Sequence, residues 1–218
     1  MTLVLVAHGT RDPAGAVVIG KIAAAVRARV DVPVLVAYAD VRQPDVTSVL
    51  RGLSGPVVVV PAFLAAGYHV RVDVPAQIAL SGLADVVVTE PIGAALLPVV
   101  RERLREAGWA PGDAVVLAAA GSSDPRALAD VVDVASALGA EVGYIATASP
   151  SVADVVASLR ASGRRVAVAS WLLAPGLFHH RLASVGVDLV AEPIGAHGRV
   201  VDAVLLRYYE ARCFRQVA

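Results

Sequence analysis

Two hydrophobic patterns alternate along the chain. Short runs rich in β-branched residues are followed by longer Ala-rich segments whose apolar residues recur every three or four positions. The first pattern predicts strands and the second predicts helices, so the order of elements is that of repeated β-α-β units. Eight strands are expected, at about residues 2–7, 33–39, 56–60, 84–88, 114–119, 141–146, 165–170 and 187–190.

The predicted strands are apolar on both faces. The segment PVVVVP, residues 56–61, shows no alternation of polar and apolar positions, which is typical of parallel strands covered by helices on both sides. The chain is therefore predicted to be an α/β protein with mainly parallel sheets.

The second half of the chain repeats the first, because four blocks recur in the same order. These are LVAHGTRDP (5–13) with LAAAGSSDP (117–125), YADVRQPDV (38–46) with YIATASPSV (144–152), VVVVPAFLAAGYH (57–69) with VAVASWLLAPGLF (166–178), and TEPIGAALLPVVRERL (89–104) with AEPIGAHGRVVDAVLL (191–206). Such a series indicates two tandem Rossmann-like units, each with a mainly parallel four-stranded sheet flanked by helices. GWAPGD, residues 108–113, has the composition of a linker, so α/β domains are predicted over residues 1–110 and 111–218.

Composition narrows the classes of function. Lys and Arg number 19, as do Asp and Glu, and 5% of the residues are aromatic, which disfavours a nucleic-acid-binding protein. The longest apolar stretch, near residues 57–66, contains Pro61 and is much shorter than the roughly 20 residues that span a bilayer. The first residues resemble a strand rather than a signal peptide, so a cytoplasmic protein is expected. The single cysteine, Cys213, excludes an internal disulfide and a CxxC redox pair.

Side chains with metal-binding chemistry follow the predicted strands of the first half. His8 follows the first strand, Asp40 the second and His69 the third. Because ligands of parallel α/β sheets bind outside the carboxyl ends of the strands, these three side chains are expected to converge. Two imidazoles and a carboxylate suit a borderline divalent cation, and three protein ligands leave coordination positions open for exchange.

The second half serves as an internal control for this prediction. The positions that match His8, Asp40 and His69 hold Ala120, Ala146 and Phe178, while the surrounding turns persist. We interpret the turns as scaffold, and the three first-half side chains as added chemistry.

Other acidic residues near these turns have structural interpretations. Asp12 recurs as Asp124, each before a proline, and Asp73 precedes Val74-Pro75, so all three are predicted to cap helices. Glu90 recurs as Glu192 and is expected near the following helix N-terminus.

Several assignments stay open on the residues alone. Asp40 is either a ligand or a turn former. His179 and His180 either face solvent or reach a ligand-binding cleft from the second half. Ser122 lacks the second glycine of a GxSxG elbow, and the chain has neither a GxGxxG after the first strand nor a GxxxxGK[ST] loop, so a serine hydrolase and a nucleotide enzyme are disfavoured.

The chain resembles the sirohydrochlorin chelatases, the class II enzymes that insert cobalt or iron in cobalamin and siroheme synthesis. The resemblance is carried by VAHGTRDP, by Asp40 in YADVRQP and by VPAFLAAGYHVRVDVP, and it extends over nearly the whole chain because the family's long form is also a duplicated chelatase-fold unit. It implies a metal-inserting lyase in which His8 and His69 are the metal-binding and catalytic histidines. Asp40 stands where relatives commonly have Glu, which keeps the carboxylate but shortens its reach.

The resemblance also implies the substrates. The carboxylates of a sirohydrochlorin-type tetrapyrrole would meet Arg11, Arg42 and Arg71, which lie in the same loops. Cobalt or ferrous iron is the expected metal substrate, nickel and zinc accept the same ligands, and no further cofactor is implied. Neutral imidazole ligates the ion and accepts pyrrole protons, with Asp40 holding the ion or orienting an imidazole.

The flat macrocycle needs an apolar wall, expected in a cleft between the two sheets. Its candidate residues are Leu64, Tyr68, Trp171, Leu172 and Phe178. A monomer is expected, without nucleic-acid or membrane partners. Two other functions fit the same residues: a metallochaperone that binds no tetrapyrrole, and a tetrapyrrole carrier that exchanges no metal. The sequence leaves open which metal is physiological and which of the two pathways is served.

Overall fold

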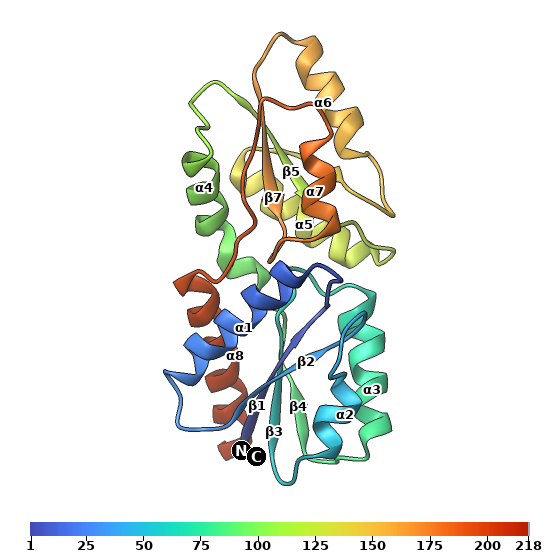
Figure 1. The fold of residues 1–218 in the computed structure, drawn as a ribbon, viewed down its shortest axis with the longest axis vertical. Helices are drawn as coiled ribbons and strands as arrows, with labels where there is room; N and C mark the ends of the chain where they lie inside the picture. Colours follow the sequence, from blue (N-terminus) through green and yellow to red (C-terminus); the bar gives the residue numbers. More distant parts are fainter. Residues whose placement is uncertain (218) are drawn as a thin grey trace. The chain divides into compact units, whose positions relative to one another are not determined.

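A computed structural model gives the structure of residues 1–217, without the side chains of residues 94 and 215–217. The chain forms two compact units, each containing one four-stranded sheet (Figure 1). Unit 1 comprises Met1–Ala95 with Ala196–Ala218, and unit 2 comprises Leu96–Gly195. All paired strands are parallel, which confirms the predicted fold class.

Unit 1 is built around a sheet of strand order β2-β1-β3-β4. Its strands are β1 (Thr2–Ala7), β2 (Val34–Tyr38), β3 (Val57–Pro61) and β4 (Val86–Val88). Helices α1 (Pro13–Arg27) and α8 (Gly198–Val217) cover one face, and α2 (Val46–Arg51) and α3 (Val74–Ser81) cover the other (Figure 1). Because helices cover both faces, β1 and β3 are buried along their whole length, as their continuous apolar sequences predict.

Unit 2 repeats this arrangement with the strand order β6-β5-β7-β8. Its strands are β5 (Ala114–Ala119), β6 (Glu141–Tyr144), β7 (Val166–Trp171) and β8 (Leu189–Val190). Its helices are α4 (Leu97–Glu106), α5 (Pro125–Leu138), α6 (Val152–Ala161) and α7 (Leu177–Ala183). The identical strand order agrees with the duplication expected from the four repeated blocks.

The compact units differ from the predicted domains 1–110 and 111–218. Helix α4 ends the first repeat in sequence but packs against β7 and α5 in unit 2, whereas α8 ends the second repeat but packs against β3 and α1 in unit 1. The chain passes between the units at the two EPIGA motifs, residues 90–94 and 192–196, and each unit is completed by the other repeat's last helix. The predicted linker, residues 108–113, connects α4 to β5 within unit 2.

The strand register determines where the loops of unit 1 begin. Ala7 pairs with Tyr38, and Val6 pairs with Pro61, so β1, β2 and β3 end at the same edge of the sheet. The residues that follow these strands therefore start next to one another. None of the helices within residues 1–217 combines the length and the hydrophobicity of a transmembrane span.

Candidate metal centre

A glycine brings the first two loops into contact. Gly9 adopts φ +97°, and a Cβ at this position would lie 2.2 Å from the carbonyl oxygen of Asp40. The Asp40 amide donates to the His8 carbonyl oxygen at 3.0 Å, and Arg42 Nη1 donates to the Thr10 carbonyl oxygen at 3.0 Å. These contacts hold the His8 and Asp40 backbones together at the end of the sheet.

The same backbone arrangement is present in unit 2 without the ligand side chains. Gly121 has φ +93°, and a Cβ at this position would lie 1.9 Å from the Ala146 carbonyl oxygen, while the Ala146 amide donates to the Ala120 carbonyl oxygen at 3.0 Å. The loop geometry is therefore a property of the repeated scaffold, as the sequence comparison predicts. The first repeat adds an imidazole and a carboxylate to it.

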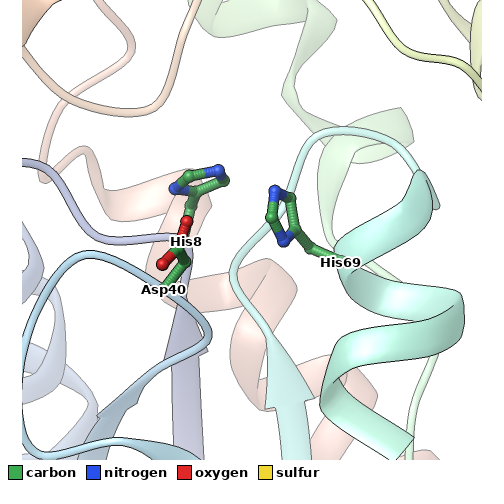
Figure 2. Close-up of side chains that lie close together, drawn as sticks. All are labelled: His8, Asp40 and His69. Carbon is green, nitrogen blue, oxygen red and sulfur yellow. The ribbon is translucent and has the colours of Figure 1, made fainter.

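His69 lies at the start of a single π-helical turn, η1 (His69–Asp73), between β3 and α3. Arg71 Nε donates to the Ala66 carbonyl oxygen at 2.8 Å and ties this turn back to the loop that leaves β3. His69 is half-buried, and its ring is directed toward the loop that carries His8 (Figure 2).

The three predicted ligands converge, as expected from their positions after the strands. One potential ligand atom from each of His8, Asp40 and His69 lies within 4.8 Å of the others, and no other such group of three occurs among the described residues. The two imidazole rings are 4.3 Å apart between centroids in an edge-to-face arrangement, with the Asp40 carboxylate beside His8 (Figure 2). His8 and Asp40 are exposed, so the group can be reached from solvent.

The geometry of Asp40 is compatible with both interpretations that the sequence left open. Its Oδ1 accepts a hydrogen bond from the Val41 amide at 2.6 Å, as a turn-forming Asp does. Its carboxylate nevertheless belongs to the group of potential ligands. A carboxylate has lone pairs for both contacts, so the turn fixes the side chain without preventing metal binding.

The environment of His8 favours its neutral form. The surrounding loops desolvate the ring, and together with the neighbouring His69 they lower the pKa of His8 below its usual 6.5; the Gly9 carbonyl oxygen and the Asp40 and Asp73 carboxylates oppose this shift. Nδ1 of His8 lies 3.0 Å from the Gly9 carbonyl oxygen, which can only accept a hydrogen bond. The neutral ring therefore carries its proton on Nδ1 and presents the lone pair of Nε2.

One sequence prediction in this region is wrong. Asp73 does not cap α3 with its side chain; its Oδ2 lies 2.5 Å from Nδ1 of His69 instead. The π-helical turn continues the helical backbone through Asp73, which therefore lacks the extended conformation of a capping residue. The two other predicted caps are confirmed, because Asp12 accepts from the Ala14 amide and Asp124 from the Arg126 amide.

The predicted substrate-binding arginines differ in how they are placed. Arg11 and Arg71 are exposed, whereas Arg42 is half-buried and lies over the Tyr38 ring, with its guanidinium carbon 5.9 Å from the ring centroid. Arg42 therefore supports the loops in addition to any contact with a substrate.

Exposed apolar side chains adjoin the ligands in unit 1. Tyr68 is 53% exposed with its ring centroid 6.2 Å from that of His69, and Val41 is 47% exposed next to Asp40. Leu64 is half-buried. In unit 2, Trp171 is buried and Leu172 and Phe178 are half-buried. The expected wall between the sheets stays a prediction.

Fold and site together define a class: duplicated α/β proteins with an accessible group of metal-binding side chains at one sheet edge. The family model CbiX matches residues 2–107 and 114–211. The chain belongs to the CbiX family, which confirms the family expected from its motifs.

Solved structures with the same fold cover almost the whole chain. SirB from Bacillus subtilis with Fe3+ has a TM-score of 0.81 at 22% identity, covering 96% of this chain and 94% of that one. The sirohydrochlorin chelatase SirB from Bacillus subtilis subspecies spizizenii in complex with cobalt has a TM-score of 0.76 at 21% identity, with coverages of 96% and 94%. CbiX, described as the terminal enzyme of siroheme biosynthesis in denitrifying bacteria, has a TM-score of 0.68 at 20% identity, with coverages of 97% and 99%. No curated protein matches the chain.

Proposed function

We propose that this protein inserts cobalt or ferrous iron into a sirohydrochlorin-type tetrapyrrole, as a metal-inserting lyase that needs no nucleotide. The observation that carries the proposal is the convergence of His8, Asp40 and His69 at an accessible sheet edge in a chain of the CbiX family. The similarity to SirB with Fe3+ and with cobalt supports this choice of substrate and metals.

The three side chains would hold the metal substrate before its transfer. The two Nε2 atoms are the free ring nitrogens, because Nδ1 of each histidine contacts an oxygen. Metal–nitrogen bonds of about 2.1 Å place two ligand atoms no more than about 4.2 Å apart. One nitrogen or carboxylate oxygen from each of the three side chains already lies within 4.8 Å of the others, so a small movement of the side chains is enough to bind the ion.

Open coordination positions make the ion transferable. Three protein ligands leave positions that water occupies first and the pyrrole nitrogens of the macrocycle take afterwards. Imidazole and carboxylate together accept cobalt, ferrous iron, nickel and zinc, so the same ligands tolerate several metals.

Proton removal accompanies metal entry. Two pyrrole N–H protons leave while one divalent ion enters, so the charge of the macrocycle core is unchanged. As the ion moves to the macrocycle, His8 and His69 lose their metal and each can accept one proton on Nε2. The lowered pKa of His8 keeps this nitrogen unprotonated and available before transfer.

Cationic and apolar groups next to the ligands would hold the macrocycle. The exposed Arg11 and Arg71 can pair with its carboxylates, and the exposed Tyr68 offers an aromatic face beside His69.

The test is an anaerobic absorbance time course with sirohydrochlorin and either cobalt or ferrous iron, without ATP. We expect metallation faster than in the protein-free control. A metallation rate no faster than that of the protein-free control, for every divalent metal tried, would contradict the proposal. Cobalt binding without tetrapyrrole binding would identify a metallochaperone, and tetrapyrrole binding without metal exchange would identify a carrier.

A further inference from the structure

The contact between Asp73 and His69 is a feature of unit 1 that metal ligation alone does not require. Asp73 Oδ2 lies 2.5 Å from Nδ1 of His69, four residues earlier, and both side chains are about one-third exposed. Asp73 is not one of the three side chains that converge as potential ligands. It approaches the side of the His69 ring that the metal would not use.

The two repeats start the same helix in the same way. The Arg71 amide donates to the Gly67 carbonyl oxygen at 3.1 Å, and in unit 2 the His180 amide donates to the Gly176 carbonyl oxygen at 3.0 Å. His69 and Phe178 each lie two residues after these glycines. The two segments can therefore be compared residue by residue from this point.

The repeats then differ by one residue. In unit 2 the next core side chain is Leu182, four residues after Phe178 and 1% exposed. In unit 1, beyond Val70 at 8% exposed, the next side chain in the core cluster is Val74, five residues after His69 and 0% exposed. The Val74 amide donates to the His69 carbonyl oxygen, the five-residue spacing of a π-helical turn. The first repeat thus has one more residue before its core contact, accommodated as a π turn.

The extra residue determines where Asp73 lies. Counted from the shared glycine, Asp73 matches Leu182, which is buried in the core of unit 2. Because Val74 fills the core position in unit 1, Asp73 is free to face His69. Single π turns occur frequently at functional sites, and the effect of this one is to place Asp73 beside His69.

We propose that Asp73 is a positioning residue for His69, and that the π turn at His69–Asp73 is the device that brings the two together. The carboxylate accepts a hydrogen bond from Nδ1–H, which fixes the ring orientation and the tautomer that leaves the Nε2 lone pair directed at the metal. A carboxylate behind a ligating histidine also strengthens it as a donor. This inference rests on the proposed function only for its claim about metal affinity.

The test compares the wild type with Asp73→Ala by two measurements. The first is the 15N NMR spectrum of the His69 ring in the metal-free protein at a pH where the ring is neutral. We expect the Nδ1–H tautomer in the wild type and a shift toward the Nε2–H tautomer in the variant. The second is cobalt affinity by calorimetry, which we expect to fall by about 10- to 100-fold.

Asp124→Ala is the matched control, because it removes a carboxylate that caps α5 in unit 2 and touches neither histidine. It should lower stability without changing the His69 spectrum or the cobalt affinity. An unchanged His69 tautomer in Asp73→Ala would overturn the inference, even if activity fell. If the wild type bound no cobalt, the proposed function would fail, while the tautomer would still test the role of Asp73.

Discussion

His8 is exposed, yet its pKa is lowered by desolvation and by the neighbouring His69. The folded protein therefore binds a proton at His8 less readily than the unfolded chain does. The contribution of His8 to the free energy of unfolding therefore decreases as the pH falls below 6.5, its ordinary pKa. Above pH 6.5 this contribution is constant. Protons should compete with metal at His8 only below pH 6.5.

An NMR titration of the metal-free protein tests this shift. We expect the His8 ring to titrate with a midpoint below 6.5, and the midpoint to move upward in His69→Gln because the electrostatic effect of His69 on His8 is removed. A midpoint at or above 6.5 in the wild type would contradict this description of the His8 environment.

Gly9 is the residue on which the proximity of the first two loops depends. Replacing it with Ala should cost about 1–2 kcal/mol for the left-handed backbone alone. The Cβ placed 2.2 Å from the Asp40 carbonyl oxygen would add to this cost and separate His8 from Asp40. We expect Gly9→Ala to lower both the free energy of unfolding in urea and the cobalt affinity.

Gly20→Ala is the matched control for this substitution. Gly20 lies inside α1, and a Cβ there would meet nothing within 4 Å. It should raise the free energy of unfolding by about 0.5–1 kcal/mol and leave cobalt binding unchanged. If Gly9→Ala changed the free energy of unfolding and the cobalt affinity no more than Gly20→Ala does, the backbone conformation at position 9 would not require glycine.

At the level of elements, the exchanged helices make each sequence repeat incomplete. A fragment of residues 1–110 contains α4, which packs in unit 2, and lacks α8, which covers β3. The buried side chains of α8 include Val200, Val204 and Tyr208, and their absence would expose the sheet to water. Because α4 and α8 follow the same EPIGA motif, α4 of one copy can cover the sheet of another.

We therefore predict that the fragment 1–110 associates into dimers. Light scattering coupled to gel filtration measures its mass in solution. A folded monomer of the fragment, with a cooperative unfolding transition, would show that helix exchange is not needed for the stability of unit 1.

The strands and the ligand group were predictable from the sequence, whereas the helix exchange and the π turn were not. Runs such as Val57–Pro61 are apolar on both faces, which is typical of a strand covered by helices on both sides. The replacement of His8 by Ala120 in the second repeat indicated that the histidine belongs to the site and not to the structural requirements of the turn. Helices α4 and α8 follow the same motif, so the sequence alone does not assign them to a sheet. Asp73 precedes Val74-Pro75, the pattern of a helix cap, and one extra residue in a helical turn changes no composition.

For the whole molecule, the duplication predicts one metal site per chain. Unit 2 keeps the loop backbone but has Ala120 and Ala146 where the first two ligands stand in unit 1. Calorimetry with cobalt should give one equivalent per chain, and His8→Ala should abolish it. Two equivalents would show a second metal site in the chain, and binding lost in His179→Ala and kept in His8→Ala would place the metal in the second repeat.

The initial rate of sirohydrochlorin metallation by histidine variants tests whether His8 and His69 carry out metal insertion. It should be measured with cobalt for the wild type, His8→Ala, His69→Ala and the control His180→Ala, with circular dichroism to verify folding. We predict that both ligand variants lose activity by roughly 100-fold or more, the effect of removing a group that binds the ion and accepts a proton. His180→Ala should retain the wild-type rate. Wild-type rates in either His8→Ala or His69→Ala, with the fold intact, would show that the substituted histidine is not needed for metal insertion.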